Sequence, residues 1–175
     1  MKVLGLDLSY TRTGIVLLES KSDEDGMSSI VLLDSLAMKF PPTEKRLAKA
    51  YGSISSELAP GRRTAFHTID LAVIEDPIYG VFSKHSKIIP TASLKLAELA
   101  AVWKIFLEIR NLPYLTVSPT AVKRFITGRG DADKVMVAPE IKRRYAISFA
   151  KDPGNDLSDA TSLALWGLLT KGNQS

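Results

Sequence analysis

The chain has 175 residues, of which 45% are hydrophobic, and a net charge of +4, as expected for one globular domain, residues 1–175, with a sizeable core. It contains no cysteine, which excludes disulfide bonds and thiolate metal sites and is compatible with a reducing cytoplasm. The sequence opens without a signal-peptide pattern, and no uncharged apolar run is long enough to cross a membrane, so we expect a cytoplasmic protein.

The first 39 residues predict three β-strands in a meander. Residues 2–9 form a short, mostly apolar strand, and residues 13–19 form its antiparallel partner after a turn at 9–12. Residues 20–29 are polar and charged and predict a loop, which leads into a third strand at 30–39.

Helices and strands alternate in the middle of the chain. The apolar spacing predicts a helix at 44–58, a buried strand at 69–75 and a long helix at 91–110, and residues 114–117 predict a fifth strand. A loop is expected at 77–90, between the fourth strand and the long helix. This order predicts an α/β fold, in which a five-stranded mixed sheet is flanked by helices.

The last third predicts three helices and carries most of the positive charge. The first helix begins at Ser118 with Pro119 in its first position, and the others span 132–149 and 156–169. Residues 120–151 contain eight basic and three acidic side chains, a net charge of +5, so the rest of the chain carries −1. This segment suggests a polyanionic partner, although a solvated helix face would show the same charge.

The long helix at 91–110 is apolar on nearly every side. A helix of this kind needs more than one surface to bury against. Five side chains exceed what one sheet face would cover: Leu96, Leu99, Trp103, Phe106 and Leu107. We therefore expect one face of this helix at a homodimer interface, unless the C-terminal helices of the same chain cover it.

Asp7 interrupts one predicted strand and Glu75 ends another. Burying a carboxylate is costly unless a cation, a metal ion or solvent compensates it. Because ligand sites in open α/β sheets lie beyond the carboxyl ends of strands, the two acids meet if their strands are neighbours. Alternatively, Asp7 caps the following turn and Glu75 is an ordinary surface residue.

Asp156 and Asp159 open the final helix with a spacing that puts both on one face. Acids at this position are also explained by helix capping and the helix dipole, with Asn155 and Ser158 as rival caps. Together with the two strand acids, they supply the hard oxygen ligands that Mg²⁺ or Mn²⁺ prefers. Two such ions about 4 Å apart can drive phosphodiester hydrolysis.

Other sequence features bear on which cofactors and ligands the chain could bind. The two histidines, His67 and His85, do not build a zinc motif, and the chain has no glycine-rich phosphate loop, so no nucleotide cofactor is expected. The loop at 77–90 combines cations with aromatic rings, which suits a nucleic-acid backbone and an unstacked base, or simply a soluble loop. The side chains concerned are Tyr79, Phe82, Lys84, His85 and Lys87.

Taken together, these features show that the chain resembles the RuvC-type Holliday-junction resolvases, which are nucleases of the RNase H-like fold. The residues that carry the resemblance are spread over nearly the whole chain: G-L-D-x-x-x-x-x-T-G at 5–14, V-I-E at 73–75, A-S-L-K-L-A-E-L-A at 92–100, V-K at 122–123, A-D-K at 132–134 and N-D-L-S-D-A-T-S-L-A at 155–164. The last of these is the most specific.

The resemblance implies a role for each matching residue. The four acids, Asp7, Glu75, Asp156 and Asp159, fall on the family's metal-binding positions, with two Mg²⁺ ions per active site and Mn²⁺ as a substitute. Lys123 and Lys134 fall where the family has basic residues near the scissile phosphate. The loop after the fourth strand falls where the family inserts an aromatic and basic segment into the junction. The family acts as a homodimer that cuts four-way DNA symmetrically. The basic segment adds four expected DNA contacts: Arg124, Arg129, Lys142 and Arg143.

Three other interpretations remain open. An actin-like phosphotransferase begins with a similar strand, but it needs a second copy of the fold and a glycine-rich turn, which residues 8–11 do not offer. Another RNase H-like nuclease, acting on RNA–DNA hybrids or other branched DNA, would carry the same acids. A non-catalytic junction-binding module would not need all four of them.

Overall fold

The computed structural model describes residues 1–9, 12–22, 28–40, 46–59, 62–77, 91–152 and 154–172. Within these ranges its elements are, in order, β1 (Lys2–Leu8), β2 (Arg12–Ser22), β3 (Ser28–Lys39), α1 (Arg46–Glu57), the 3-10 helix η1 (Thr64–His67), β4 (Leu71–Glu75), α2 (Thr91–Ile109), β5 (Tyr114–Val117), α3 (Pro119–Thr127), α4 (Lys134–Tyr145) and α5 (Asp156–Lys171). None of the helices in these ranges is long and apolar enough to cross a membrane.

The strands form one mixed sheet in the order β3-β2-β1-β4-β5. β1, β2 and β3 pair antiparallel, whereas β4 runs parallel to both β1 and β5. The five-stranded mixed sheet predicted from the sequence is therefore confirmed. Strand β1 lies at its centre, so residues at the end of β1 have strand neighbours on both sides.

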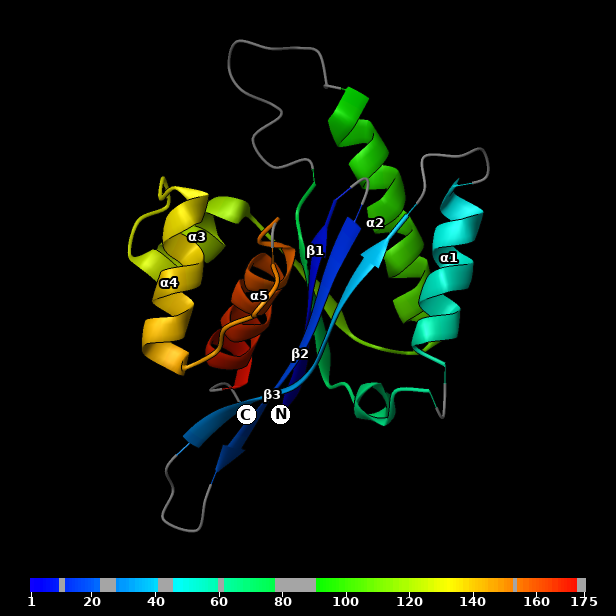
Figure 1. Ribbon diagram of the computed structural model, residues 1–175. Coiled ribbons are helices and arrows are strands. Elements are labelled where there is room, and N and C mark those ends of the chain that lie inside the picture. The colour runs from blue at the N-terminus through cyan, green and yellow to red at the C-terminus, as the bar shows by residue number, and fades with distance from the viewer. Residues whose placement is uncertain are drawn as a thin grey trace.

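The β2–β3 hairpin is longer than predicted. Ser20 pairs with Ile30 and Lys21 with Ser29, so the ladder runs into the segment that the sequence predicts to be a loop. Figure 1 shows this hairpin projecting beyond the rest of the sheet. Lys21 and Ser29 are exposed there, and polar residues in a solvated two-stranded ladder are easily mistaken for a loop.

Two helical layers cover the sheet, with α1 and α2 on one face and α3, α4 and α5 on the other (Figure 1). Alternate side chains of β1 point to opposite faces of the sheet and so enter two separate hydrophobic cores. Leu4 and Leu6 join the core beneath α1 and α2, whereas Val3 joins the core beneath α5. Because alternate residues share a face, Gly5 and Asp7 lie on the α5 side with Val3.

Helix α5 rests almost directly on the sheet because two strand positions are glycine. A Cβ atom at Gly5 would collide with the carbonyl oxygen of Ala160, and one at Gly14 would collide with the backbone of Asp156. Glycine allows this close backbone approach. Asp7 is the register partner of Gly14, so the contact fixes the first turn of α5 beside the end of β1.

Helix α2 buries one face within the chain. Four of the side chains expected at a dimer interface are buried in the core beneath α1 and α2: Leu99, Trp103, Phe106 and Leu107. The fifth, Leu96, is partly buried against the same core. The prediction was therefore wrong about these residues, because α1 supplies the second surface. The large apolar side chains that α2 exposes are Leu94, Ile105 and Ile109.

The C-terminal helices follow the predicted order with adjusted ends. Ser118 caps α3 by accepting from the backbone N–H of Ala121, and Pro119 occupies the first turn, as predicted. Helix α4 ends at Tyr145 rather than near 149, because Ala146 adopts a left-handed conformation with φ of 57°.

Candidate metal centre and basic pocket

Asp7 and Glu75 lie together at one edge of the sheet. The parallel register of β1 and β4 pairs Leu6 with Ile74, so the next residue of each strand is one of these acids. Asp7 is only 8% exposed and Glu75 is half-buried. The structure therefore juxtaposes the two strand acids, as expected if their strands are neighbours, and it places them on the face that α5 covers.

Another acid caps helix α5. The carboxylate of Asp152 accepts hydrogen bonds from the backbone N–H of Leu157 at 3.1 Å and of Ser158 at 2.9 Å, and from the Ser158 hydroxyl at 2.8 Å. Asn155, one of the expected rival caps, makes no side-chain capping bond. Because Asp152 satisfies these N–H groups, Asp156 and Asp159 are available for another role.

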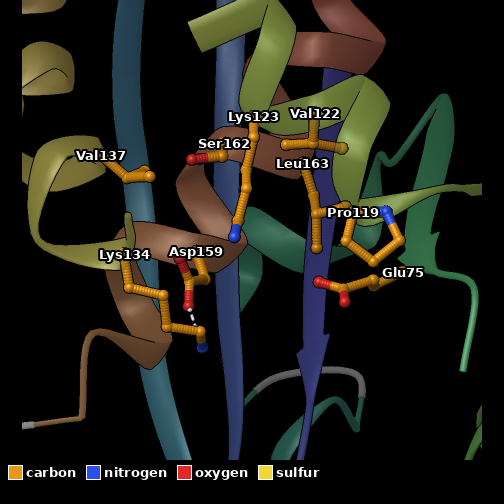
Figure 2. Close-up of a pocket in the computed structure, with 9 residues that line it drawn as sticks. All are labelled: Glu75, Pro119, Val122, Lys123, Lys134, Val137, Asp159, Ser162 and Leu163. Carbon is orange, nitrogen blue, oxygen red and sulfur yellow. Dashed lines mark hydrogen bonds and ion pairs between the residues drawn. The ribbon is translucent and has the colours of Figure 1, made fainter. Parts of the chain in front are cut away.

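Asp159 and Glu75 share a pocket of about 160 Å³ with two lysines. Figure 2 shows the carboxylates of both acids and the amino group of Lys123 directed toward the same space. Lys134 reaches Asp159 from the other side, and its amino group donates a hydrogen bond of 2.9 Å to the Asp159 carboxylate. The pocket thus combines acids and cations contributed by β4, α3, α4 and α5.

The acids repel one another in a poorly solvated environment. Burial, together with the negative charges of Asp159 and Glu75, raises the pKa of Asp7 to about 8. Burial and then Asp159 also raise the pKa of Glu75, whereas the ammonium of Lys134 lowers the pKa of both acids. The hydrogen bond to Asp159 raises the pKa of Lys134, which keeps its amino group charged at neutral pH. The centre therefore lacks positive charge to balance the repulsion between its acids.

The donor set fits a divalent metal ion. Carboxylate oxygens are the hard ligands that Mg²⁺ and Mn²⁺ prefer, and a cation between Asp7, Glu75 and Asp159 would remove their mutual repulsion. Within the described ranges, no group of three acidic or histidine side chains is already arranged so that it could hold a metal ion. Lys134 holds Asp159 instead, so a metal ion bound by this acid would have to share it with the ammonium group or displace that group.

Asp156 lies against a different partner. Its carboxylate forms an ion pair with the guanidinium Nε of Arg12 at the start of β2. The two side chains line a separate pocket together with Ser9, Lys39 and Gly154. Arg12 is a site residue that the sequence does not mark, because a cation after a turn carries no distinctive signal.

The other predicted DNA contacts are dispersed. Four of them lie exposed on α3, on α4 and between these helices: Arg124, Arg129, Lys142 and Arg143. Arg129 pairs with Asp131, and Arg143 pairs with Glu140 on its own helix, so both cations have acidic neighbours. The remaining predicted contacts lie outside the described residues: Tyr79, Phe82, Lys84, His85 and Lys87.

The raised pKa of Asp7 predicts a pH-dependent cost in stability. Between about pH 4 and pH 8 the folded chain retains a proton that the unfolded chain releases, so this group destabilises the metal-free fold increasingly as pH rises through that window. Asp7→Asn removes the titration. We expect it to increase the free energy of unfolding in EDTA by about 2 kcal/mol or more at pH 7, and by little near pH 4.

Urea unfolding of both proteins from pH 4 to pH 8 measures this difference. Glu98→Gln, which changes an exposed acid on α2, should follow the wild-type profile. Parallel profiles for wild type and Asp7→Asn would show that Asp7 is not held in its protonated form.

The strand order and the helices on both faces define an RNase H-like fold, and the acids at the ends of β1 and β4 place candidate metal ligands at one edge of its sheet. Residues 3–166 match the family described as crossover junction endodeoxyribonuclease RuvC, and the chain belongs to this family. The resemblance stated from the sequence motifs is therefore confirmed.

Relatives and solved structures agree with this assignment. The crossover junction endodeoxyribonuclease RuvC of Koribacter versatilis is 28% identical over 97% of this chain and 93% of its own length. That of Carboxydothermus hydrogenoformans is 25% identical over 98% of both chains. The Thermus thermophilus RuvC structure has 20% identity and superposes with a TM-score of 0.70 over 98% of this chain and 97% of its own.

Proposed function

We infer that this chain is a crossover junction endodeoxyribonuclease that resolves Holliday junctions by hydrolysing phosphodiester bonds. The observation that carries this inference is the pocket in which Glu75 and Asp159 face Lys123 and Lys134, with Asp7 beside them, in a chain that matches the family over residues 3–166. A Thermus thermophilus RuvC of similar fold, with a TM-score of 0.69, has been solved in complex with a Holliday junction substrate. The two sequence relatives described above are bacterial, and we propose a cytoplasmic, single-domain enzyme of bacterial or phage origin.

We propose that the four acids, Asp7, Glu75, Asp156 and Asp159, hold two Mg²⁺ ions and that Mn²⁺ substitutes for them. Such ions supply an activated water and stabilise the charge that develops on the phosphate. The protein's own contribution is to position the substrate. Lys123 projects from α3 toward the pocket and offers its ammonium group to a phosphate, while the apolar wall behind it, which includes Val122 and Leu163, limits the access of water.

Cleavage of three matched substrates tests the function. We expect a mobile four-way junction to be cut in Mg²⁺ and not in EDTA, and a linear duplex and an RNA–DNA hybrid to be cut far more slowly. Preferential cutting of the hybrid would favour the other RNase H-like nucleases. Junction binding without metal-dependent nicking would identify a non-catalytic binding module.

We also propose that the enzyme is a homodimer, because a four-way junction presents two symmetric strands to be cut. The exposed apolar face of α2, which includes Leu94, Ile105 and Ile109, is the surface we assign to the two-fold contact. Light scattering at micromolar concentration should give about twice the 19.1 kDa of one chain. Ile105→Lys should shift the mass toward the monomer, because it places an ammonium group in the apolar contact.

Lys104→Ala, on the same helix, is the control for the effect of mutating α2 itself. A wild-type mass near 19.1 kDa would contradict the dimer. An unchanged dimer in Ile105→Lys would place the contact elsewhere.

A further inference from the structure

The ion pair between Arg12 and Asp156 joins a proposed metal ligand to a cation. Asp156 is 8% exposed, and a buried carboxylate needs a partner. The partner that the structure gives it is the Nε of Arg12, whose side chain is 21% exposed. The negative charge of Asp156 also acts on Asp7, so the carboxylate lies near the proposed metal centre as well as against a partly exposed guanidinium.

The surrounding chain is built to hold Arg12 in this position. The backbone N–H of Arg12 donates to the Ser9 hydroxyl at 3.0 Å, and the backbone N–H of Ser9 donates to the Arg12 carbonyl oxygen at 3.0 Å, so the start of β2 is bonded to the residue that follows β1. Gly154 leaves room for the guanidinium. A Cβ atom at Gly154 would collide with Nη2 of Arg12 and would lie 3.0 Å from Oδ2 of Asp156.

The two acids of α5 are thus each held by a cation from a different element. Lys134 of α4 holds Asp159, and Arg12 of β2 holds Asp156. Asp156 and Arg12 line one pocket, whereas Asp159 and Lys134 line another. Asp156 cannot serve a metal ion with both oxygen atoms while Arg12 occupies one of them, so the ion pair and full metal ligation compete for the same group.

We propose that Arg12 is a positioning residue that holds Asp156 while the metal site is empty, and that a divalent ion must displace it to bind. This inference rests on the proposed function, because it concerns the same metal centre. Arg12 then sets the metal concentration that the enzyme requires. It also protects the metal-free fold, because it prevents the buried Asp156 carboxylate from being left without a countercharge.

Mn²⁺ binding to the DNA-free protein tests the competition, with free Mn²⁺ measured by electron paramagnetic resonance at fixed pH and salt. We expect Arg12→Gln to lower the dissociation constant about tenfold, which is within the range of coupling between residues of one ion-pair network. Arg12→Lys keeps a cation at this position and should bind Mn²⁺ as the wild type does. Lys39→Gln removes another cation from the same pocket and should change the affinity less than twofold.

A double-mutant cycle establishes whether Arg12 acts through Asp156. Asp156→Asn removes the charge for which Arg12 and the metal compete, so Arg12→Gln should then change Mn²⁺ affinity less than twofold. If Arg12→Gln increased Mn²⁺ affinity equally in the Asp156→Asn background, Arg12 would act only as a general positive charge, and the proposal would be overturned. Weaker Mn²⁺ binding by Arg12→Gln alone would show that Arg12 supports the bound metal, which would also overturn it.

A measurement on the unaltered protein covers the case in which Arg12→Gln does not fold. The ¹⁵N NMR signal of the Arg12 Nε–H should be protected from exchange in EDTA and should lose this protection as Mg²⁺ is added. Retained protection at saturating Mg²⁺ would overturn the displacement. None of these measurements uses DNA, so a wild type that binds metal without cutting the junction would disprove the proposed function and leave the Arg12 result standing.

Discussion

Asp7→Asn and Glu75→Gln are each expected to reduce junction cleavage by on the order of a thousandfold or more, while junction binding stays intact or becomes stronger. Each substitution keeps the shape of the side chain and removes a negative charge at the end of a central strand. The charge is needed to hold a divalent ion but not to contact the phosphates. In EDTA below about pH 8 the raised pKa of Asp7 already keeps that side chain protonated, so Asp7→Asn leaves the charge near the DNA unchanged, and neither substitution removes a phosphate contact, so affinity does not fall.

Single-turnover cleavage in Mg²⁺ and a binding titration in EDTA, at the same salt concentration, separate the two effects. Glu98→Gln, an exposed acid on α2, should cut at the wild-type rate. A near wild-type rate for Asp7→Asn or Glu75→Gln would remove that residue from the metal centre. Loss of binding in step with loss of cleavage would point to misfolding, which the unfolding curves in EDTA would reveal.

Lys134→Ala is expected to lower the single-turnover rate about a hundredfold at saturating protein and metal. Lys134 stands in the first turn of α4, where the helix dipole disfavours a cation, and its amino group reaches across to Asp159 at 2.9 Å. That position is within reach of a phosphate bound in the pocket beside Glu75. A fixed ammonium there stabilises the additional negative charge that develops on the phosphate during hydrolysis.

Lys142→Ala is the matched control, because Lys142 is an exposed cation two turns further along the same helix and outside the Lys134 pocket. It should weaken junction binding modestly and leave the saturated rate unchanged, since many cations share the backbone contacts. If Lys134→Ala lost affinity but kept its saturated rate, Lys134 would be one more phosphate contact without a role in the chemical step.

The architecture and the positions of the two strand acids could be predicted from the sequence, because both follow from its hydrophobic periodicity. Alternation along β1 places Asp7 on the same face as Val3, and the apolar run of β4 ends at Glu75. Two such strands in parallel bring their carboxyl ends to one edge. The spacing of Asp156 and Asp159 also indicated a shared helix face, but it could not show that each acid faces a different cation.

The remaining features depend on contacts between distant segments, which no local pattern encodes. Arg12 meets Asp156 only because α5 lies across β2, and Asp152 becomes a cap only because the chain turns back before the helix. The burial of Trp103 likewise depends on α1, which supplies a second apolar surface inside the chain. A single sequence gives the polarity of these residues but not their partners.

Gly5 and Gly14 limit how far this sequence can drift over evolutionary time. Any side chain at either position would lift α5 from the sheet and move its first-turn acids relative to Asp7, although neither glycine has a functional group of its own. Selection for cleavage should therefore purge changes at these two positions as strictly as changes at the acids. At Gly52 of α1 an added Cβ would meet nothing within 4 Å among the described residues beyond its own helix backbone, so this glycine lies outside the constraint and is free to vary among descendants.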